Sequence, residues 1–172
     1  MKRMRLHIAM AIAAVLAGLM SPTQAAQAEM DLLASYIGSW RGSGTLVGGE
    51  QPESFRCRLT VNKGTAAKIN YAGRCTLVNM NLSVAGTIAY NDAARRYEAA
   101  MSSNAGFTGI AVGRKSGDRI SFDLSERQVD RGGNDIRIGS KITLISDQIT
   151  VDFEVEFNNS GQILTAKVPF SR

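Results

Sequence analysis

The chain has 172 residues, with 20 Lys and Arg against 15 Asp and Glu, so its formal net charge is +5. Three of these basic residues, Lys2, Arg3 and Arg5, precede an uncharged run over 8–20. Without residues 1–28 the chain keeps 17 basic and 15 acidic side chains, a net charge of +2. This near balance removes the main support for a nucleic-acid partner. The apolar run is also shorter than the roughly 20 residues that a membrane-spanning helix needs.

The first 28 residues have the three parts of a secretory signal peptide. The basic start and the apolar run are followed by Ser21-Pro22 and by the small-residue stretch Ala26-Gln27-Ala28. We therefore predict cleavage near Glu29 and a single mature domain over 29–172. No Cys lies at the predicted cleavage point, so we expect a soluble protein that is periplasmic or secreted, without a lipid anchor or a transmembrane segment.

The two cysteines agree with export. Cys57 and Cys75 are the only cysteines of the chain, and in an oxidising compartment a single pair is expected to form a disulfide. They do not form a Cys-x-x-Cys motif and lack the further ligands that a zinc site requires. We predict that they join neighbouring antiparallel strands that turn near Asn62-Lys63-Gly64.

Helical spacing is confined to the start of the mature chain, where Leu32, Leu33, Tyr36 and Ile37 would share one face of a two-turn helix. From Trp40 onward, short alternating segments recur between clusters of Gly, Asn, Asp and Ser. This pattern predicts an all-β protein, a single antiparallel up-and-down barrel of about ten strands. The strands are expected near 40–47, 53–61, 68–78, 82–90, 95–102, 107–114, 118–125, 135–145, 148–157 and 162–170.

The last three strands can be aligned from the sequence. A two-residue turn at Ser146-Asp147 places Leu144 opposite Ile149, and every further apolar pair then falls on the same face. The other face matches charges, with Lys141 and Lys167 both beside Asp152, and Arg137 opposite Glu156. The predicted apolar pairs are Leu144–Ile149, Ile142–Val151, Ile138–Val155, Ile136–Phe157, Val155–Leu164, Phe153–Ala166, Val151–Val168 and Ile149–Phe170.

One strand is ambiguous. Near 107–114, the pair Ile110 and Val112 and the pair Ala111 and Gly113 both offer a plausible inner face.

The segment Gly38-Ser39-Trp40-Arg41-Gly42-Ser43-Gly44 follows the predicted helix. A helix, this Gly-x-Trp-x-Gly-x-Gly run and about ten meandering strands resemble the calycin group, which includes lipocalins, fatty-acid-binding proteins and nitrobindin-like barrels. The resemblance implies that Trp40 plugs one end of the barrel and stacks on a basic residue of a late strand, for which Lys167 and Arg172 are the candidates. Alternatively, Trp40 is a core aromatic with no bearing on family.

The chemistry of the mature chain is sparse. His7, the only histidine, lies in the predicted signal peptide, so the mature protein lacks the His on which Ser-His-Asp catalysis, His-based zinc sites and nitrobindin-like haem binding depend. We therefore expect that the protein is not an enzyme and that it binds neither a metal nor a cofactor. The Gly109–Ser116 segment does not have phosphate-loop spacing. The acidic residues Asp152, Glu154 and Glu156 are expected on an outer, ion-paired face.

Two functions remain open. The first is a non-enzymatic barrel that binds a small, mainly hydrophobic ligand in its interior, where small residues at Ala99, Gly109, Ala111 and Ala166 would leave room. The candidate interior lining is Tyr71, Tyr90, Tyr97, Met101, Phe122 and Phe153.

The second is a solid barrel that contacts an envelope protein through its loops. Here the polar segment 125–135 would be a mobile mouth loop, with Arg131, Gly132 and Gly133 at its centre.

Overall fold

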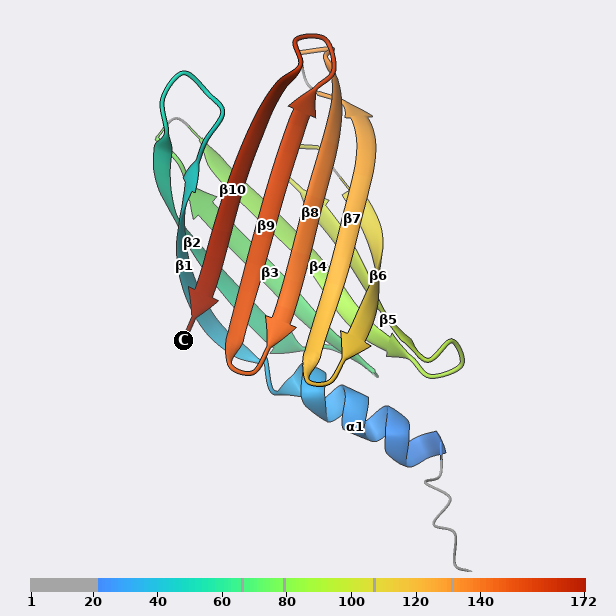
Figure 1. Ribbon diagram of the computed structural model, residues 1–172. Helices are drawn as coiled ribbons and strands as arrows, with labels where there is room; N and C mark the ends of the chain where they lie inside the picture. Colours follow the sequence, from blue (N-terminus) through green and yellow to red (C-terminus); the bar gives the residue numbers. More distant parts are fainter. Residues whose placement is uncertain (1–21, 66, 79, 107, 131) are drawn as a thin grey trace, which may run out of the picture.

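The computed structural model describes residues 22–65, 67–78, 80–106, 108–130 and 132–172. One helix precedes ten antiparallel strands, which close into a single barrel (Figure 1). Each strand pairs with its neighbours in the chain, and the first strand closes the barrel against the last. The elements are α1 (Pro22–Ala34), β1 (Gly38–Leu46), β2 (Glu53–Lys63), β3 (Lys68–Thr76), β4 (Asn81–Asn91), β5 (Arg96–Ser103), β6 (Thr108–Ser116), β7 (Arg119–Val129), β8 (Asp135–Ile145), β9 (Gln148–Phe157) and β10 (Gln162–Ser171).

The all-β barrel of ten strands predicted from the alternation is confirmed. Most strand bounds lie within two residues of the expectation, whereas the helix and β7 differ more. The helix begins at Pro22 and therefore runs across the predicted cleavage point, while most of the predicted signal peptide, residues 1–21, lies outside the described part of the chain. Strand β7 continues to Val129 instead of ending near 125, because Glu126 and Gln128 keep its alternating burial.

The predicted register of the last three strands is confirmed at every pair. Arg137 pairs with Glu156, with its Nε 2.7 Å from Oε2, and Lys167 lies 3.7 Å from Asp152. Lys141 lies opposite Asp152 in the register, as predicted. Its ammonium lies 3.9 Å from Asp123 of β7, because the register places Lys141 between two carboxylates and Asp152 is taken by Lys167.

The glycines after Trp40 allow the barrel to close. Gly42 faces Phe170 across the β1–β10 pair, and a Cβ atom at Gly42 would lie 2.6 Å from the Pro169 carbonyl oxygen. A Cβ at Gly44 would lie 2.8 Å from the Lys167 carbonyl oxygen. At these two positions the strands therefore approach one another more closely than a side chain in place of Gly42 or Gly44 would permit.

The β6–β7 pair has one of the two shortest backbone pairings in the wall, the other being β1–β10. Its backbone pairing covers only four residue pairs, from Gly113–Phe122 to Ser116–Arg119. Farther along, the side-chain amide of Gln128 donates to the Thr108 carbonyl oxygen at 3.3 Å. The described residues of this seam thus combine backbone pairing at one end with a side-chain contact at the other.

The same strand resolves the ambiguous inner face. Ala111 and Gly113 face the interior and are buried, whereas Ile110 is 75% exposed on the outside. A Cβ at Gly109 would lie 2.5 Å from Leu124, and one at Gly113 would lie 2.5 Å from Phe122. The space beside the two glycines is therefore filled by large side chains of β7, and the expectation that Gly109 leaves room for a ligand was wrong.

Candidate ligand-binding site

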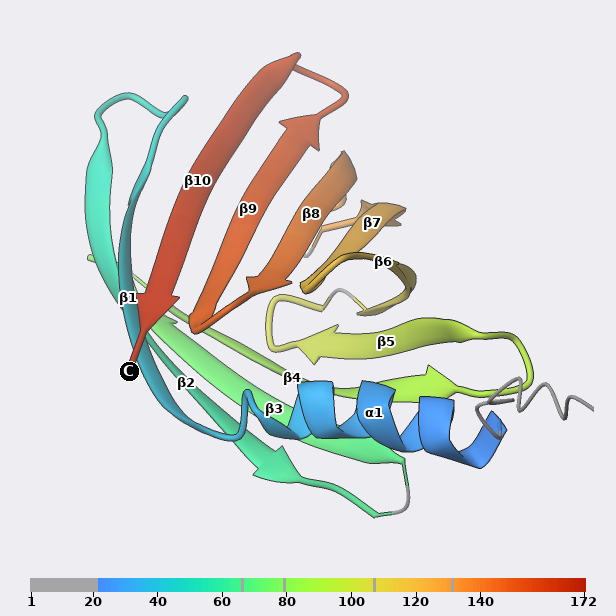
Figure 2. The ribbon, with the colours of Figure 1, turned by 60° about the horizontal axis from the view of Figure 1, so that its bottom comes forward.

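Helix α1 covers one end of the barrel (Figure 2). Leu33, Tyr36 and Trp40 are each at most 1% exposed and fill this end. The Trp40 indole Nε1 donates to the Tyr36 carbonyl oxygen at 3.0 Å. The Arg172 guanidinium carbon lies 4.5 Å from the centroid of the Trp40 ring, a cation–π arrangement. Arg172 and not Lys167 therefore stacks on the tryptophan, since Lys167 points outward toward Asp152.

Glu29 fastens the helix to the barrel wall. Its carboxylate accepts hydrogen bonds from the Lys115 ammonium at 2.6 and 2.7 Å and from the Tyr97 hydroxyl. Burial by itself raises the pKa of Glu29, but the hydrogen bonds from Lys115 and Tyr97 outweigh it and hold the pKa below its usual value. Burial and the bond to Glu29 raise the pKa of Tyr97. The sequence had no local signal for this contact, because Glu29 and Lys115 are 86 residues apart.

The disulfide joins β2 and β3 on the inner face. Cys57 and Cys75 are directly opposite in the register, with their Cα atoms 4.0 Å apart. Direct cross-strand neighbours in an antiparallel pair approach to this order of distance. The predicted pairing of the two cysteines and of their strands is therefore present in the structure.

The half of the barrel next to α1 is almost fully packed. Tyr71, Tyr97 and Phe122 lie here with at most 9% exposure, and Tyr90 contacts Tyr97 edge-on. Two cavities in the described interior measure about 10 and 50 Å³. Ligand pockets usually measure some hundreds of Å³, so each of these two cavities has room for no more than water-sized molecules.

The Tyr71 hydroxyl, inside the packed half, forms a hydrogen bond with a neighbouring strand. The Tyr71 hydroxyl donates to the Ala100 carbonyl oxygen at 3.3 Å, and burial raises the pKa of Tyr71 to about 12. Gly86 makes the contact possible, because a Cβ there would lie 2.0 Å from the Ala100 oxygen. This part of the interior is therefore built for packing and for hydrogen bonding within the protein.

The opposite end of the barrel has a different lining. A second apolar cluster, here called the mouth cluster, contains Ile136 and Ile138 as its buried members, surrounded by side chains that are only partly buried. These side chains come from β4, β5 and β9 and face the interior. The partly buried members of the mouth cluster are Leu82, Val84, Met101, Phe153, Val155 and Phe157.

Two polar side chains face inward near the mouth cluster. Glu126 and Gln128 continue the inward-facing positions of β7, and Glu126 is opposite Ile138 in the β7–β8 register. Among the described residues, no ion pair involves Glu126. This end thus combines apolar surface with a carboxylate, the usual composition of a small-molecule site.

The predicted mouth loop is short and internally bonded. It spans 130–134, since β7 ends at Val129 and β8 begins at Asp135. The Asp130 carboxylate accepts hydrogen bonds from the backbone N–H groups of Gly132 and Asn134, both at 2.8 Å, and the bonds from Asn134 contribute most to lowering the pKa of Asp130. Gly132 and Gly133 lie in this turn, whereas Arg131 is outside the described residues. The connection is therefore shorter than the predicted 125–135, because both neighbouring strands extend into that range.

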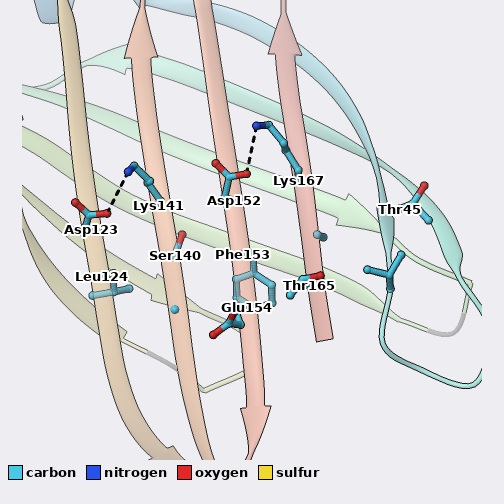
Figure 3. A pocket seen from close by; sticks show the side chains of 13 residues that line it. Thr45, Asp123, Leu124, Ser140, Lys141, Asp152, Phe153, Glu154, Thr165 and Lys167 are labelled. Atoms are coloured by element: carbon cyan, nitrogen blue, oxygen red, sulfur yellow. Dashed lines mark ion pairs between the residues drawn. The ribbon is translucent and has the colours of Figure 1, made fainter. Parts of the chain in front are cut away.

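A surface pocket of about 570 Å³ lies over β7–β10 and the end of β1. Figure 3 shows its charged side chains paired across neighbouring strands, Asp123 with Lys141 and Asp152 with Lys167. Glu154 lies 3.5 Å from Arg137. The acidic residues of β9 are thus partnered on an outer face, as their spacing predicted, and have the character of a solvated wall.

The six candidate lining residues divide between the two halves. Phe153 belongs to the mouth cluster and Met101 packs against both clusters, whereas Tyr71, Tyr90, Tyr97 and Phe122 lie in the packed half. Sequence reasoning did not select Val84, Val155 and Phe157, although the alternation of their strands was the available signal.

Within the described ranges, no three His, Cys, Asp or Glu side chains are grouped as a metal site would require. Over the same ranges, no helix has the length and apolar character needed to cross a bilayer.

No protein-family model matches the chain, and no curated protein matches its sequence. Solved structures do match it. Rv2717c from M. tuberculosis aligns with a TM-score of 0.64 and 16% identity over 83% of this chain and 96% of that one. The S-type phycobiliprotein lyase CPES from Guillardia theta aligns with a TM-score of 0.53 and 16% identity over 83% of this chain and 90% of that one.

What the chain shares with them is the β-barrel fold. At this level of identity the likeness concerns the fold alone.

Proposed function

We propose that the protein is an exported, non-enzymatic barrel that binds a small, mainly hydrophobic molecule in the half of the barrel that carries the mouth cluster. The observation that carries the proposal is the partly exposed apolar lining from β4, β5 and β9. Apolar side chains that face a barrel interior and still contact solvent gain free energy when a ligand covers them. The S-type phycobiliprotein lyase, whose name refers to bilin-carrying proteins, shares the fold and adds general support.

The proposal differs in one respect from the simplest lipocalin-like arrangement. The interior cavities of about 10 and 50 Å³ among the packed aromatic residues are too small for such a ligand. The ligand would lie against Met101, Phe153 and Val155, with Glu126 able to accept a hydrogen bond from a polar group at its outer end.

Binding of Nile red, a neutral hydrophobic fluorophore, tests this location. We expect saturable binding to the wild-type protein, and a rise in Kd of roughly tenfold or more in the Val155→Ser/Phe157→Ser variant, because apolar contact area is lost. The matched control is Ile110→Ser/Ile163→Ser, which removes two exposed apolar side chains from the outer wall. Circular dichroism confirms that both variants are folded.

Non-saturable binding, or an equal loss of binding in the control, would contradict the proposal. A native mass spectrum of the protein purified from its own host provides a second readout. Added mass that disappears in the Val155→Ser/Phe157→Ser variant would identify the molecule that the mouth cluster holds.

A further inference from the structure

Three arginines lie side by side across the outer wall of the barrel. The register places Arg41 of β1 opposite Arg58 of β2, and Arg58 opposite Arg74 of β3. All three are exposed, as is Arg56, two residues along β2. Directly opposite side chains have Cβ atoms about 5 Å apart, so the row places the Cβ atoms of three arginines within about 10 Å.

This arrangement is unfavourable for folding. Like charges directly opposite one another destabilise a sheet, and among the described residues no ion pair compensates Arg41, Arg58 or Arg74. The neighbouring outward positions carry uncharged polar side chains, for example Ser43, Thr76 and Ser83. On the β7–β10 wall, by contrast, Arg137, Lys141 and Lys167 have acidic partners on adjacent strands, although Arg127 lies opposite Arg137.

A groove extends the arginine row toward the uncovered end of the barrel. It has a volume of about 610 Å³, and its lining includes Arg56, Thr76 and Val78. Val78 is 77% exposed and Met80 is 51% exposed. Both lie in the β3–β4 connection, next to the strand that carries Arg74. Cationic and exposed apolar side chains therefore meet on one side of the molecule.

We propose that this wall docks the protein onto membranes that contain anionic phospholipids. The arginine row and Arg56 would contact headgroup phosphates, which guanidinium groups bind in bidentate fashion. Val78 and Met80 would enter the boundary between headgroups and acyl chains. The outward positions of β1–β4 that the structure describes carry no aromatic side chain for stacking on bases, so the apolar residues favour a membrane over a nucleic acid.

Flotation with lipid vesicles tests the proposal, using the chain as its host produces it and no added ligand. One set of vesicles contains phosphatidylglycerol and phosphatidylcholine, and the other contains phosphatidylcholine alone. We expect binding to the anionic vesicles only, and weaker binding as salt screens the charges. Each basic residue near such a surface is worth about fivefold in affinity, so Arg58→Thr/Arg74→Thr should bind roughly 30-fold more weakly.

The control variant, Arg119→Thr/Arg127→Thr, removes the same charge from exposed positions of β7. All proteins share one N-terminus, so residues before the barrel contribute equally. If the control variant lost the same affinity for anionic vesicles, the effect would come from net charge alone, and the proposal would be overturned. Binding to duplex DNA without binding to vesicles would also overturn it. Val78→Ser/Met80→Ser should weaken binding to anionic vesicles without changing its dependence on salt.

The vesicle-binding experiment does not depend on the ligand proposed for the mouth cluster. Vesicle docking is measured without Nile red, and the arginine variants leave the mouth cluster intact. Loss of docking with Nile red binding retained would therefore separate the two proposals.

Discussion

Glu29 is the residue through which the helix and the barrel wall are joined by hydrogen bonds. Its partners Tyr97 and Lys115 belong to β5 and β6, so one carboxylate links three elements. The Glu29 side chain is 19% exposed and the Lys115 side chain is 35% exposed, which places the contact at the edge of the packed end. A partly desolvated pair of this kind is stronger than a pair on the open surface.

Replacing this carboxylate should change how stability depends on pH. The folded-state pKa of Glu29 lies below its ordinary value of 4.5, so its stabilising contribution is present above that value and is lost as pH falls through the folded-state pKa. We expect Glu29→Gln to lower the free energy of unfolding at pH 7, and the difference from wild type to shrink below about pH 4.5. Urea unfolding between pH 3 and 7 measures this.

The matched control for this carboxylate is Asp31→Asn, which changes a neighbouring acidic residue of the same helix. The Asp31 carboxylate accepts a hydrogen bond from the Gln27 side-chain amide at 2.7 Å. A gap between wild type and Glu29→Gln that stays constant down to pH 3 would show that the carboxylate charge is not the source of the effect.

At the scale of single elements, small residues on the inner face set how closely strands pack. Gly86 on β4 lies where a Cβ would be 2.0 Å from the Ala100 carbonyl oxygen and 2.5 Å from the Tyr71 hydroxyl. Gly139 on β8 points outward, and its nearest contact would be an ordinary 3.7 Å to Glu154. The two glycines therefore have different roles, although both lie inside strands.

Substitution of these glycines by alanine distinguishes the roles. Gly86→Ala should destabilise the protein by about 3 kcal/mol, since the backbone of β5 has to move and the Tyr71 hydrogen bond is lost. Gly139→Ala should be neutral or stabilising by about 0.5 kcal/mol, because glycine is unfavourable within a strand. Chemical denaturation measures both. Equal destabilisation by the two changes would be inconsistent with the proposed packing at Gly86.

The sequence was sufficient to align β8, β9 and β10. Apolar residues and opposite charges such as Arg137 and Glu156 impose the same alignment on both faces, and a shift by one residue would violate both. The inner face of β6 could not be predicted, because Ala111 and Gly113 are selected by the volume of Phe122 on another strand. The Glu29 contact was equally hidden, as it depends on a helix position that only the closed barrel defines.

The mouth cluster was only partly predictable for a related reason. Alternation identifies Met101 and Phe153 as inward-facing, but it does not tell which half of the barrel they occupy. That division depends on α1, which covers the end where Tyr97 and Phe122 lie. Inward-facing aromatic residues therefore pack the core at one end of the barrel and are candidate ligand contacts at the other end.

For the whole molecule, the disulfide acts mainly on the unfolded chain. The Cys57–Cys75 bond closes a loop with a sequence separation of 18, which corresponds to about 3 kcal/mol in the chain-entropy account. We expect Cys57→Ala/Cys75→Ala to lower the free energy of unfolding by about 2 to 4 kcal/mol with unchanged strand content. Urea unfolding and circular dichroism provide the two measurements.

A thiol titration of the native wild-type protein is the accompanying check. No free thiol should react until the protein is unfolded and reduced, because both cysteines are bonded. Two reactive thiols in the folded protein would show that the bond is absent in solution and would point to another role for the pair.

The closure of β1 on β10 has a consequence for the folding pathway. Arg41 and Ser171 are paired although 130 residues separate them in the chain, whereas the other strand pairs follow one another along the sequence. Hairpins can form locally, but closure requires the two ends of an otherwise assembled sheet to meet, a long-range step that is slow. Until it occurs, the sheet has two unpaired edges, and such edges promote intermolecular association. The species most prone to aggregation is therefore an almost complete barrel that has not yet closed.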